Sequence, residues 1–277
     1  MDKRIFQQLA DLADCFNRIG LKPVICGGLG IYLCFNKYEG EAQALIRTTN
    51  DIDLILTKTQ VIEQAKCRAI AEIITGELSY IVREGREYLH FKKNNDQYLD
   101  IMAPPIKGFQ TEGFRIKFVK SKLHGHITDE ACFIEENLRT VSLSQFLPNN
   151  IKSRNPEVQV PSPTNSLILK LFAFNDRDQG QRQDTERAQA HALDIYIAII
   201  LTTRADYLEG QEFLSRHRDS EIIRKARSIV NNKFSSVDKD GWQFVLETSS
   251  FFPDKNIVQQ REKLEEAGNR LKRWFTI

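Results

Sequence analysis

Long hydrophobic runs are missing from this sequence of 277 residues. The most apolar stretches, around 24–35 and 195–201, are shorter than the ~20 residues that a helix needs to span a bilayer. The first eight residues lack the apolar core and the small-residue cleavage site of a signal peptide. We therefore expect neither a membrane partner nor secretion.

Paired cysteines are missing as well. The five cysteines are scattered, mostly within apolar segments, and no CxxC pair is present. This distribution is typical of buried thiols in a reducing compartment, so the sequence predicts a cytoplasmic protein. His124-Gly125-His126 has no cysteine or acid nearby at ligand spacing, and we interpret it as a turn rather than as a metal-binding pair.

A large excess of charge is also absent, since 39 basic and 37 acidic residues give a net charge of +2. This balance neither requires nor excludes a nucleic-acid partner, because a local basic face is compatible with it. Hydrophobic residues make up 41% and charged residues 27% of the chain, which is ordinary for a globular protein. The length suits two small domains or one large one.

The order of periodic segments predicts an α/β fold class. Helix-like and strand-like segments mix up to about residue 141, a polar connection rich in proline follows, and the remaining segments have helical periodicity. We predict a mixed sheet with flanking helices in residues 1–147, a linker in 148–163 and a helical domain in 164–277. The expected strands are 23–26, 51–56, 80–82, 88–91, 98–102, 114–119, 131–134 and 138–141. The expected helices are 3–19, 29–35, 57–74, 166–175, 184–202, 206–216, 220–234, 239–249 and 256–275.

The segment 23–56 contains the residues with the clearest chemical meaning. Gly27 and Gly28 end a short apolar strand and lead into a helix, which lets backbone amides approach a phosphate at the positive end of the helix dipole. Asp51 and Asp53 alternate with apolar residues on the next strand, so both carboxylates face the same side. Neighbouring carboxylates repel each other, and a divalent cation between them removes the repulsion. The alternative interpretation of Gly27 and Gly28 is an ordinary turn, and that of Asp51 and Asp53 is an exposed edge strand.

Asp100, on a later strand, adds a third carboxylate. Three carboxylates on neighbouring strands suit two Mg²⁺ ions, with Mn²⁺ as a substitute, because magnesium also retains waters and binds substrate phosphates. Two such ions activate an attacking hydroxyl and stabilise the leaving pyrophosphate. These residue types in this order indicate nucleotidyl transfer from an NTP. A solvent-facing acid on an alternating strand is the other interpretation of Asp100.

The same residues carry a resemblance to a known family. Gly27-Gly28, Arg47-x-Thr49-x-Asp51-Ile52-Asp53 and Leu99-Asp100-Ile101 resemble the motifs of the polymerase-β-like nucleotidyltransferases. Segments 169–173 (LKLFA) and 191–196 (HALDIY) resemble the third and fourth motifs of the AbiEii/MenT branch, whose members include toxins of toxin–antitoxin pairs. The resemblance covers roughly residues 20–200.

The resemblance implies that residues 1–147 form a nucleotidyltransferase-like mixed sheet and that the helical domain 164–277 contributes to the active-site cleft. It also implies a role for each matching residue. It implies metal binding by Asp51, Asp53 and Asp100, nucleotide binding by Gly27, Gly28, Arg47, Thr49 and Lys170, and a catalytic set of Asp51, Asp53, Asp100, Lys170 and Asp194. Many relatives have Gly-Ser where this chain has Gly-Gly, so contact with the triphosphate is expected from the backbone alone. Lys170 interrupts an apolar helix and by itself is compatible with snorkelling. A buried Asp194 requires a partner such as Lys170 or Arg47.

The resemblance also implies an acceptor, either a tRNA end or a protein side chain, and a toxin with a cognate antitoxin. Two alternatives stay open. The first is a small-molecule nucleotidyltransferase that modifies an antibiotic with the same core. The second is a catalytically inactive nucleotide- or RNA-binding module, against which the three intact acids argue.

Overall fold

The chain forms two compact units. The computed structural model describes residues 3–38, 40–47, 49–83, 89–93, 97–109, 111–112, 115–118, 123–147, 155–179 and 184–276. One unit, here called the α/β unit, comprises residues 1–34 and 47–162, and the other, the helical unit, comprises residues 35–46 and 163–277. The short segment 35–46 thus belongs to the helical unit, although the sequence prediction assigned it to the first domain.

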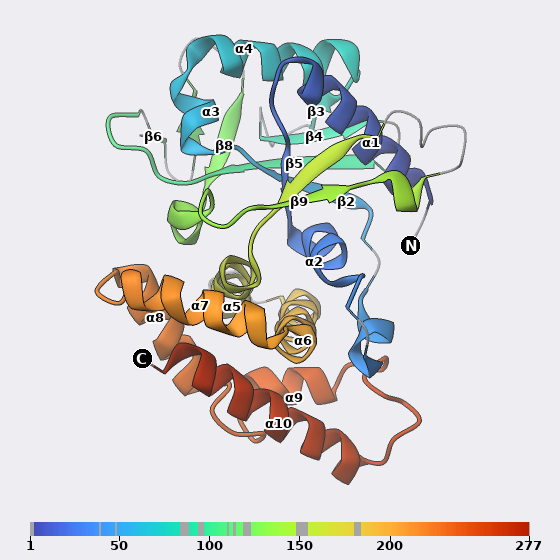
Figure 1. Ribbon diagram of the computed structural model, residues 1–277, viewed down its shortest axis with the longest axis vertical. Coiled ribbons are helices and arrows are strands. Elements are labelled where there is room, and N and C mark those ends of the chain that lie inside the picture. Colours follow the sequence, from blue (N-terminus) through green and yellow to red (C-terminus); the bar gives the residue numbers. More distant parts are fainter. Residues whose placement is uncertain are drawn as a thin grey trace. The chain divides into compact units, whose positions relative to one another are not determined.

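The α/β unit is built on a mixed sheet of ten strands within the described residues (Figure 1). Its helices are α1 (Lys3–Arg18), α2 (Gly27–Phe35), α3 (Lys58–Ile62) and α4 (Gln64–Glu72). Its strands are β1 (Val24–Cys26), β2 (Asp51–Ile55), β3 (Ile81–Val82), β4 (His90–Lys93), β5 (Gln97–Ala103), β6 (Thr111–Glu112), β7 (Arg115–Lys117), β8 (His124–Ile127), β9 (Arg139–Ser142) and β10 (Glu157–Val160).

The sheet runs in the order β6-β7-β8-β5-β2-β1-β10-β9, and β4 pairs with both β3 and β5. β2 is parallel to β5 and antiparallel to β1, while β1 is parallel to β10. In Figure 1, α3 and α4 lie on one side of this sheet and α2 lies on the other. All three residues of β1 are buried, as expected for a central strand that is covered on both faces.

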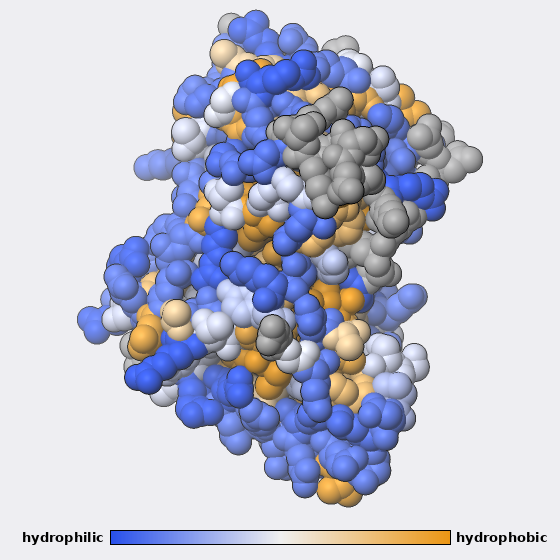
Figure 2. All heavy atoms as spheres, turned by 45° about the vertical axis from the view of Figure 1, so that its right-hand side comes forward, coloured by the Kyte–Doolittle hydropathy of each residue, from blue (hydrophilic) through white to orange (hydrophobic). Residues whose placement is uncertain are grey.

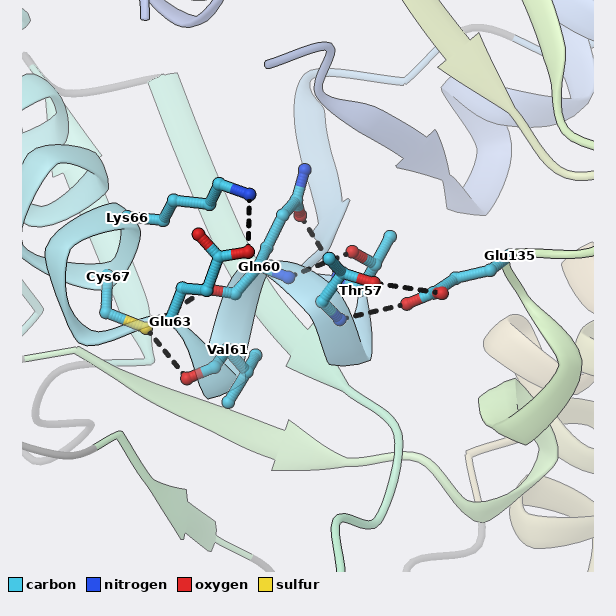
Figure 3. Close-up of polar contacts among 8 residues, drawn as sticks. Thr57, Gln60, Val61, Glu63, Lys66, Cys67 and Glu135 are labelled. Carbon is cyan, nitrogen blue, oxygen red and sulfur yellow. Dashed lines mark hydrogen bonds and ion pairs between the residues drawn. The ribbon is translucent and has the colours of Figure 1, made fainter. Parts of the chain in front are cut away.

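Polar contacts fix the exit from β2 (Figure 3). Thr57 caps α3 in a capping box, in which its hydroxyl accepts from the Gln60 amide while the Gln60 side chain accepts from the Thr57 amide. The carboxylate of Glu135 accepts from the backbone and the hydroxyl of Thr59, at 3.2 and 3.3 Å. These bonds satisfy amides of the first helical turn that would otherwise have no partner, and so hold the end of β2 in place.

The helical unit contains six α-helices within the described residues, together with a 3₁₀ turn, η1 (Glu41–Leu45). The helices are α5 (Pro163–Gln179), α6 (Thr185–Leu201), α7 (Arg204–Arg216), α8 (Glu221–Lys233), α9 (Asp240–Leu246) and α10 (Ile257–Phe275). α6 packs against α5, α9 and α10. Edge-to-face aromatic pairs fill the core, including Phe174 with Phe234 and Tyr196 with Phe251.

The fold class predicted from the sequence is confirmed: a mixed α/β sheet with flanking helices is followed by a helical C-terminal region. Four local predictions are wrong. The expected helix 57–74 breaks at Glu63, whose backbone is extended, and it ends in a π-helical turn. The expected strand 131–134 lies largely within a 3₁₀ helix, Asp129–Phe133. The expected turn 124–126 lies in β8, and residues 157–160, expected in the linker, form β10; residues 148–154 lie outside the described part.

Hydrophilic residues cover most of the face drawn in Figure 2, with hydrophobic residues in separate groups. The large hydrophobic side chains that are exposed among the described residues are Ile19, Ile62, Ile81, Leu208, Ile257 and Val258. In the described part of the chain, no helix is both long and apolar enough to cross a bilayer.

Candidate active site

Two of the predicted acids lie on adjacent strands in the middle of the sheet. β2 and β5 are parallel, and their register places Asp53 opposite Asp100. Paired residues of neighbouring parallel strands face the same side of a sheet, so the two carboxylates share one face. Asp51 lies two residues earlier and faces that side as well, while Ile52 and Leu54 are buried on the other. The alternation predicted for this strand is confirmed.

The start of α2 lies against the same carboxylate. Gly27 follows β1 directly, with φ at +66°, a left-handed conformation that favours glycine. A Cβ at this position would lie 1.7 Å from Oδ2 of Asp53. Because glycine has no side chain, the Asp53 carboxylate can lie against the first turn of α2. The helix begins at Gly27 itself, two residues earlier than the sequence predicted.

Gly28 brings two more of the predicted residues to this end of α2. A Cβ here would lie 3.3 Å from Nη2 of Arg47 and 3.5 Å from Cβ of Thr49. The hydroxyl of Thr49 accepts from the backbone amide of Asp51 at 3.3 Å. The N-terminal end of α2 thus gathers a guanidinium group and helix-terminal backbone amides, both of which attract phosphate oxygens.

Sequence reasoning missed His90. On the β4–β5 hairpin His90 is the register partner of Asp100, and its Nδ1 lies 2.6 Å from Oδ1 of Asp100. An ionised carboxylate only accepts hydrogen bonds, so the proton of this bond is carried by Nδ1. The bond orients the Asp100 carboxylate, which is one-third exposed, and leaves its other oxygen for a second partner. The sequence signal that could have found this contact is the short separation between the expected strands 88–91 and 98–102, which favours their pairing.

The chemistry of these acids suits a hard cation, but only a small part of a coordination sphere is built. No group of three or more histidine, cysteine, aspartate or glutamate side chains within the described residues is arranged to hold a metal ion. Magnesium binds through one or two carboxylates together with waters and substrate phosphates. Asp53 and Asp100, side by side next to Gly27, fit that mode.

Lys170 and Asp194 form a separate pair inside the helical unit. Lys170 on α5 and Asp194 on α6 are 5% and 1% exposed, and Nζ lies 2.6 Å from Oδ2. Of the two partners expected for a buried Asp194, the structure places Lys170 beside it. This ion pair is internally compensated, because each charge neutralises the other where water is excluded.

Comparisons with known proteins gave few matches. No family model matches the chain, and no curated protein matches it. One similar solved structure is the solution structure of the antibiotic-resistance factor ANT(2'')-Ia, with a TM-score of 0.37 and 16% sequence identity. The match covers 79% of this chain and 99% of that one.

Proposed function

We propose that the protein transfers a nucleoside monophosphate from an NTP to an acceptor hydroxyl. The observation that carries the proposal is the side-by-side placement of Asp53 and Asp100 at the point where Gly27 opens α2. Carboxylates beside helix-terminal amides and a guanidinium suit a triphosphate that arrives with a divalent cation. The resemblance to the polymerase-β-like nucleotidyltransferases, and within them to the AbiEii/MenT branch, points to the same reaction.

The reaction forms a bond between the acceptor oxygen and the α-phosphorus, and the bond from the α-phosphorus to the bridging oxygen breaks to release pyrophosphate. In the proposed mechanism Asp51, Asp53 and Asp100 would hold the cations that accompany the phosphates. Asp100, oriented by His90, receives the proton of the acceptor hydroxyl. Arg47, Thr49 and the amides of Gly27 and Gly28 bind the triphosphate. Bound Mg²⁺, or Mn²⁺ in its place, neutralises phosphate charge and lowers the pKa of the acceptor hydroxyl.

The resemblance extends the catalytic set to Lys170 and Asp194. In this proposal Lys170 stabilises negative charge on the phosphates in the transition state. Its ion pair with Asp194 provides the ammonium group with a partner at a buried position. The five free cysteines, four of them buried, suit the reducing conditions of the cytoplasm, where we place the reaction.

The acceptor distinguishes two forms of the proposal. The AbiEii/MenT resemblance favours a tRNA end or a protein side chain, in a toxin held in check by an antitoxin. The competing acceptor is a small molecule such as an antibiotic, the class of compound to which the description of ANT(2'')-Ia refers. Incubation with Mg²⁺ and each α-labelled NTP, in parallel with tRNA, protein extract and hydroxyl-bearing antibiotics, separates the two forms by which fraction becomes labelled.

The decisive variant is Asp53→Asn, which keeps the shape of the side chain and removes its charge. We expect it to lower transfer at least 100-fold, because the cation loses its central ligand. Asp129→Asn is the matched control, since Asp129 is an exposed aspartate in a 3₁₀ helix and has no role in the proposed mechanism, and its transfer stays at the parental level. Full activity in Asp53→Asn would show that the site is wrong. NTP binding without transfer to any acceptor would favour the inactive binding module.

A further inference from the structure

The helical unit contains a cavity that is independent of the acids on the sheet. Its volume is about 260 Å³, and it lies among the C-terminal end of α6, the N-terminal half of α7 and the last turns of α10. These three helices belong to one unit, and α10 packs against both α6 and α7. The lining residues are Ile199, Thr202, Thr203, Arg204, Tyr207, Arg270, Arg273 and Trp274.

The lining is strongly basic, with three arginines and no acid. Arg270 is committed in part, since Nη2 pairs with Glu266 at 2.6 Å and Nη1 donates to the carbonyl of Ile200. Arg273 donates through Nε to the carbonyl of Asn269, and neither it nor Arg204 pairs with a carboxylate among the described residues. Within the described residues these two guanidinium groups have no carboxylate partner. They lie beside the N-terminal end of α7, a helix of 13 residues, and both features favour an anion at the cavity.

Trp274 is one of the lining residues. Trp274 is 2% exposed, and its Nε1 has no hydrogen-bond partner in the described part of the chain. A buried N–H without a partner costs about 1–3 kcal/mol, so such groups are rare unless a ligand or water completes them. Tyr207 meets the indole edge to face at 5.5 Å between ring centroids. The indole also packs closely on α7 at Gly210, where a Cβ would lie 2.8 Å from Cζ2 of Trp274.

We propose that this cavity binds a planar aromatic ring that carries a phosphate group. In this proposal the side chains of Tyr207 and Trp274 provide the surface for the ring. Arg204, Arg273 and the indole N–H provide donors for the phosphate. Thr202 and Thr203 belong to the same lining. A cavity of about 150 Å³ accommodates benzene. The larger volume here therefore accommodates a six-membered ring and one phosphate.

The test measures binding by isothermal titration calorimetry on the full chain, in EDTA and without NTP. Phenyl phosphate is the main probe, inorganic phosphate and phenol are its two halves, and AMP tests a nucleotide source. We expect phenyl phosphate to bind at least tenfold more tightly than either half. The stronger of phenyl phosphate and AMP identifies whether the natural ligand is a small aryl phosphate or a nucleotide.

Four variants make the result specific. Arg204→Gln with Arg273→Gln weakens phenyl phosphate binding at least tenfold, whereas the matched pair Arg216→Gln with Arg224→Gln, elsewhere on α7 and on α8, leaves it within twofold. Trp274→Phe keeps an aromatic ring and removes the N–H, and it weakens phosphate-bearing probes while leaving phenol unchanged; circular dichroism checks its fold. Asp53→Asn leaves binding unchanged, which separates this cavity from the proposed catalytic site. Equal losses in both arginine pairs, phenol binding as tightly as phenyl phosphate, or no binding of any probe would each overturn the proposal.

Discussion

The two units hold their charged residues in opposite ways. In the α/β unit Asp51 is exposed and Asp100 is one-third exposed, so their charges remain solvated and accessible to a ligand. In the helical unit Lys170 and Asp194 are almost completely buried and neutralise each other at 2.6 Å. The first arrangement costs little to maintain and is open to an external cation. The second is part of the core, and it is stable only while both partners are present.

The largest expected effect comes from breaking the buried pair. Lys170→Met leaves Asp194 as an uncompensated buried charge, and we expect the free energy of unfolding to fall by about 3–5 kcal/mol. Replacing both partners, in Lys170→Met with Asp194→Leu, restores most of the loss, because no charge is then buried without a partner. Urea unfolding followed by circular dichroism measures both variants.

The contrasting variant in the α/β unit is Asp51→Asn. Asp51 is exposed, so we expect a change in unfolding free energy of no more than about 0.5 kcal/mol. If Asp51→Asn lowered the free energy of unfolding as much as Lys170→Met does, the distinction between a solvent-exposed and a buried charge would be contradicted. A double variant no more stable than Lys170→Met would show instead that packing, rather than charge, accounts for the loss.

A smaller effect is expected at the turn that separates β1 from α2. Gly20 and Gly27 both have positive φ, +72° and +66°, so alanine at either position incurs the left-handed backbone cost of about 1–2 kcal/mol. Only at Gly27 would the new Cβ also meet a side chain, at 1.7 Å from Oδ2 of Asp53, whereas nothing lies within 4 Å at Gly20. Overpacking of this kind adds about 1–3 kcal/mol.

The Gly20→Ala variant is therefore the control for Gly27→Ala. We expect Gly27→Ala to be the less stable of the two in the same urea titration and to lose nucleotidyl transfer, because Asp53 is displaced. Gly20→Ala should retain transfer. Equal stability of the two variants would mean that Asp53 moves aside freely, and that the close approach at Gly27 does not position the carboxylate.

The units also differ in how far their structure could be predicted from the sequence. The helices of the helical unit were predicted within a few residues, because helical periodicity is a local property of the chain. The buried Lys170–Asp194 contact was one of the two pairings considered, since a charge inside an apolar helix requires a partner. The alternation of Asp51 and Asp53 with apolar residues on β2 was likewise predicted, because the period of two of a strand is also a local property of the chain.

What sequence reasoning missed depends on pairing between distant segments. Residues 157–160 form a central strand only because β1 is available beside them, and residues 124–127 form β8 because β5 and β7 lie on either side. His90 could not be assigned to Asp100 without the register of β4 and β5. A shift of one residue in that register would turn the imidazole to the other face.

The last prediction tests this missed residue. His90→Ala removes the hydrogen bond to Oδ1 of Asp100, and we expect nucleotidyl transfer to fall about 10–100-fold, as is usual when the partner that orients a metal-binding carboxylate is lost. The unfolding free energy changes by only about 1 kcal/mol, because the pair is partly exposed. Titration of transfer against Mg²⁺ provides the discriminating readout, since a poorly oriented Asp100 raises the concentration required for half-maximal activity. Lys92→Ala, on the same strand opposite Tyr98, is the control and leaves that concentration unchanged. A uniform loss of activity at all Mg²⁺ concentrations would mean that His90 acts on the acceptor instead. The Asp100 carboxylate would then not depend on His90 for its orientation.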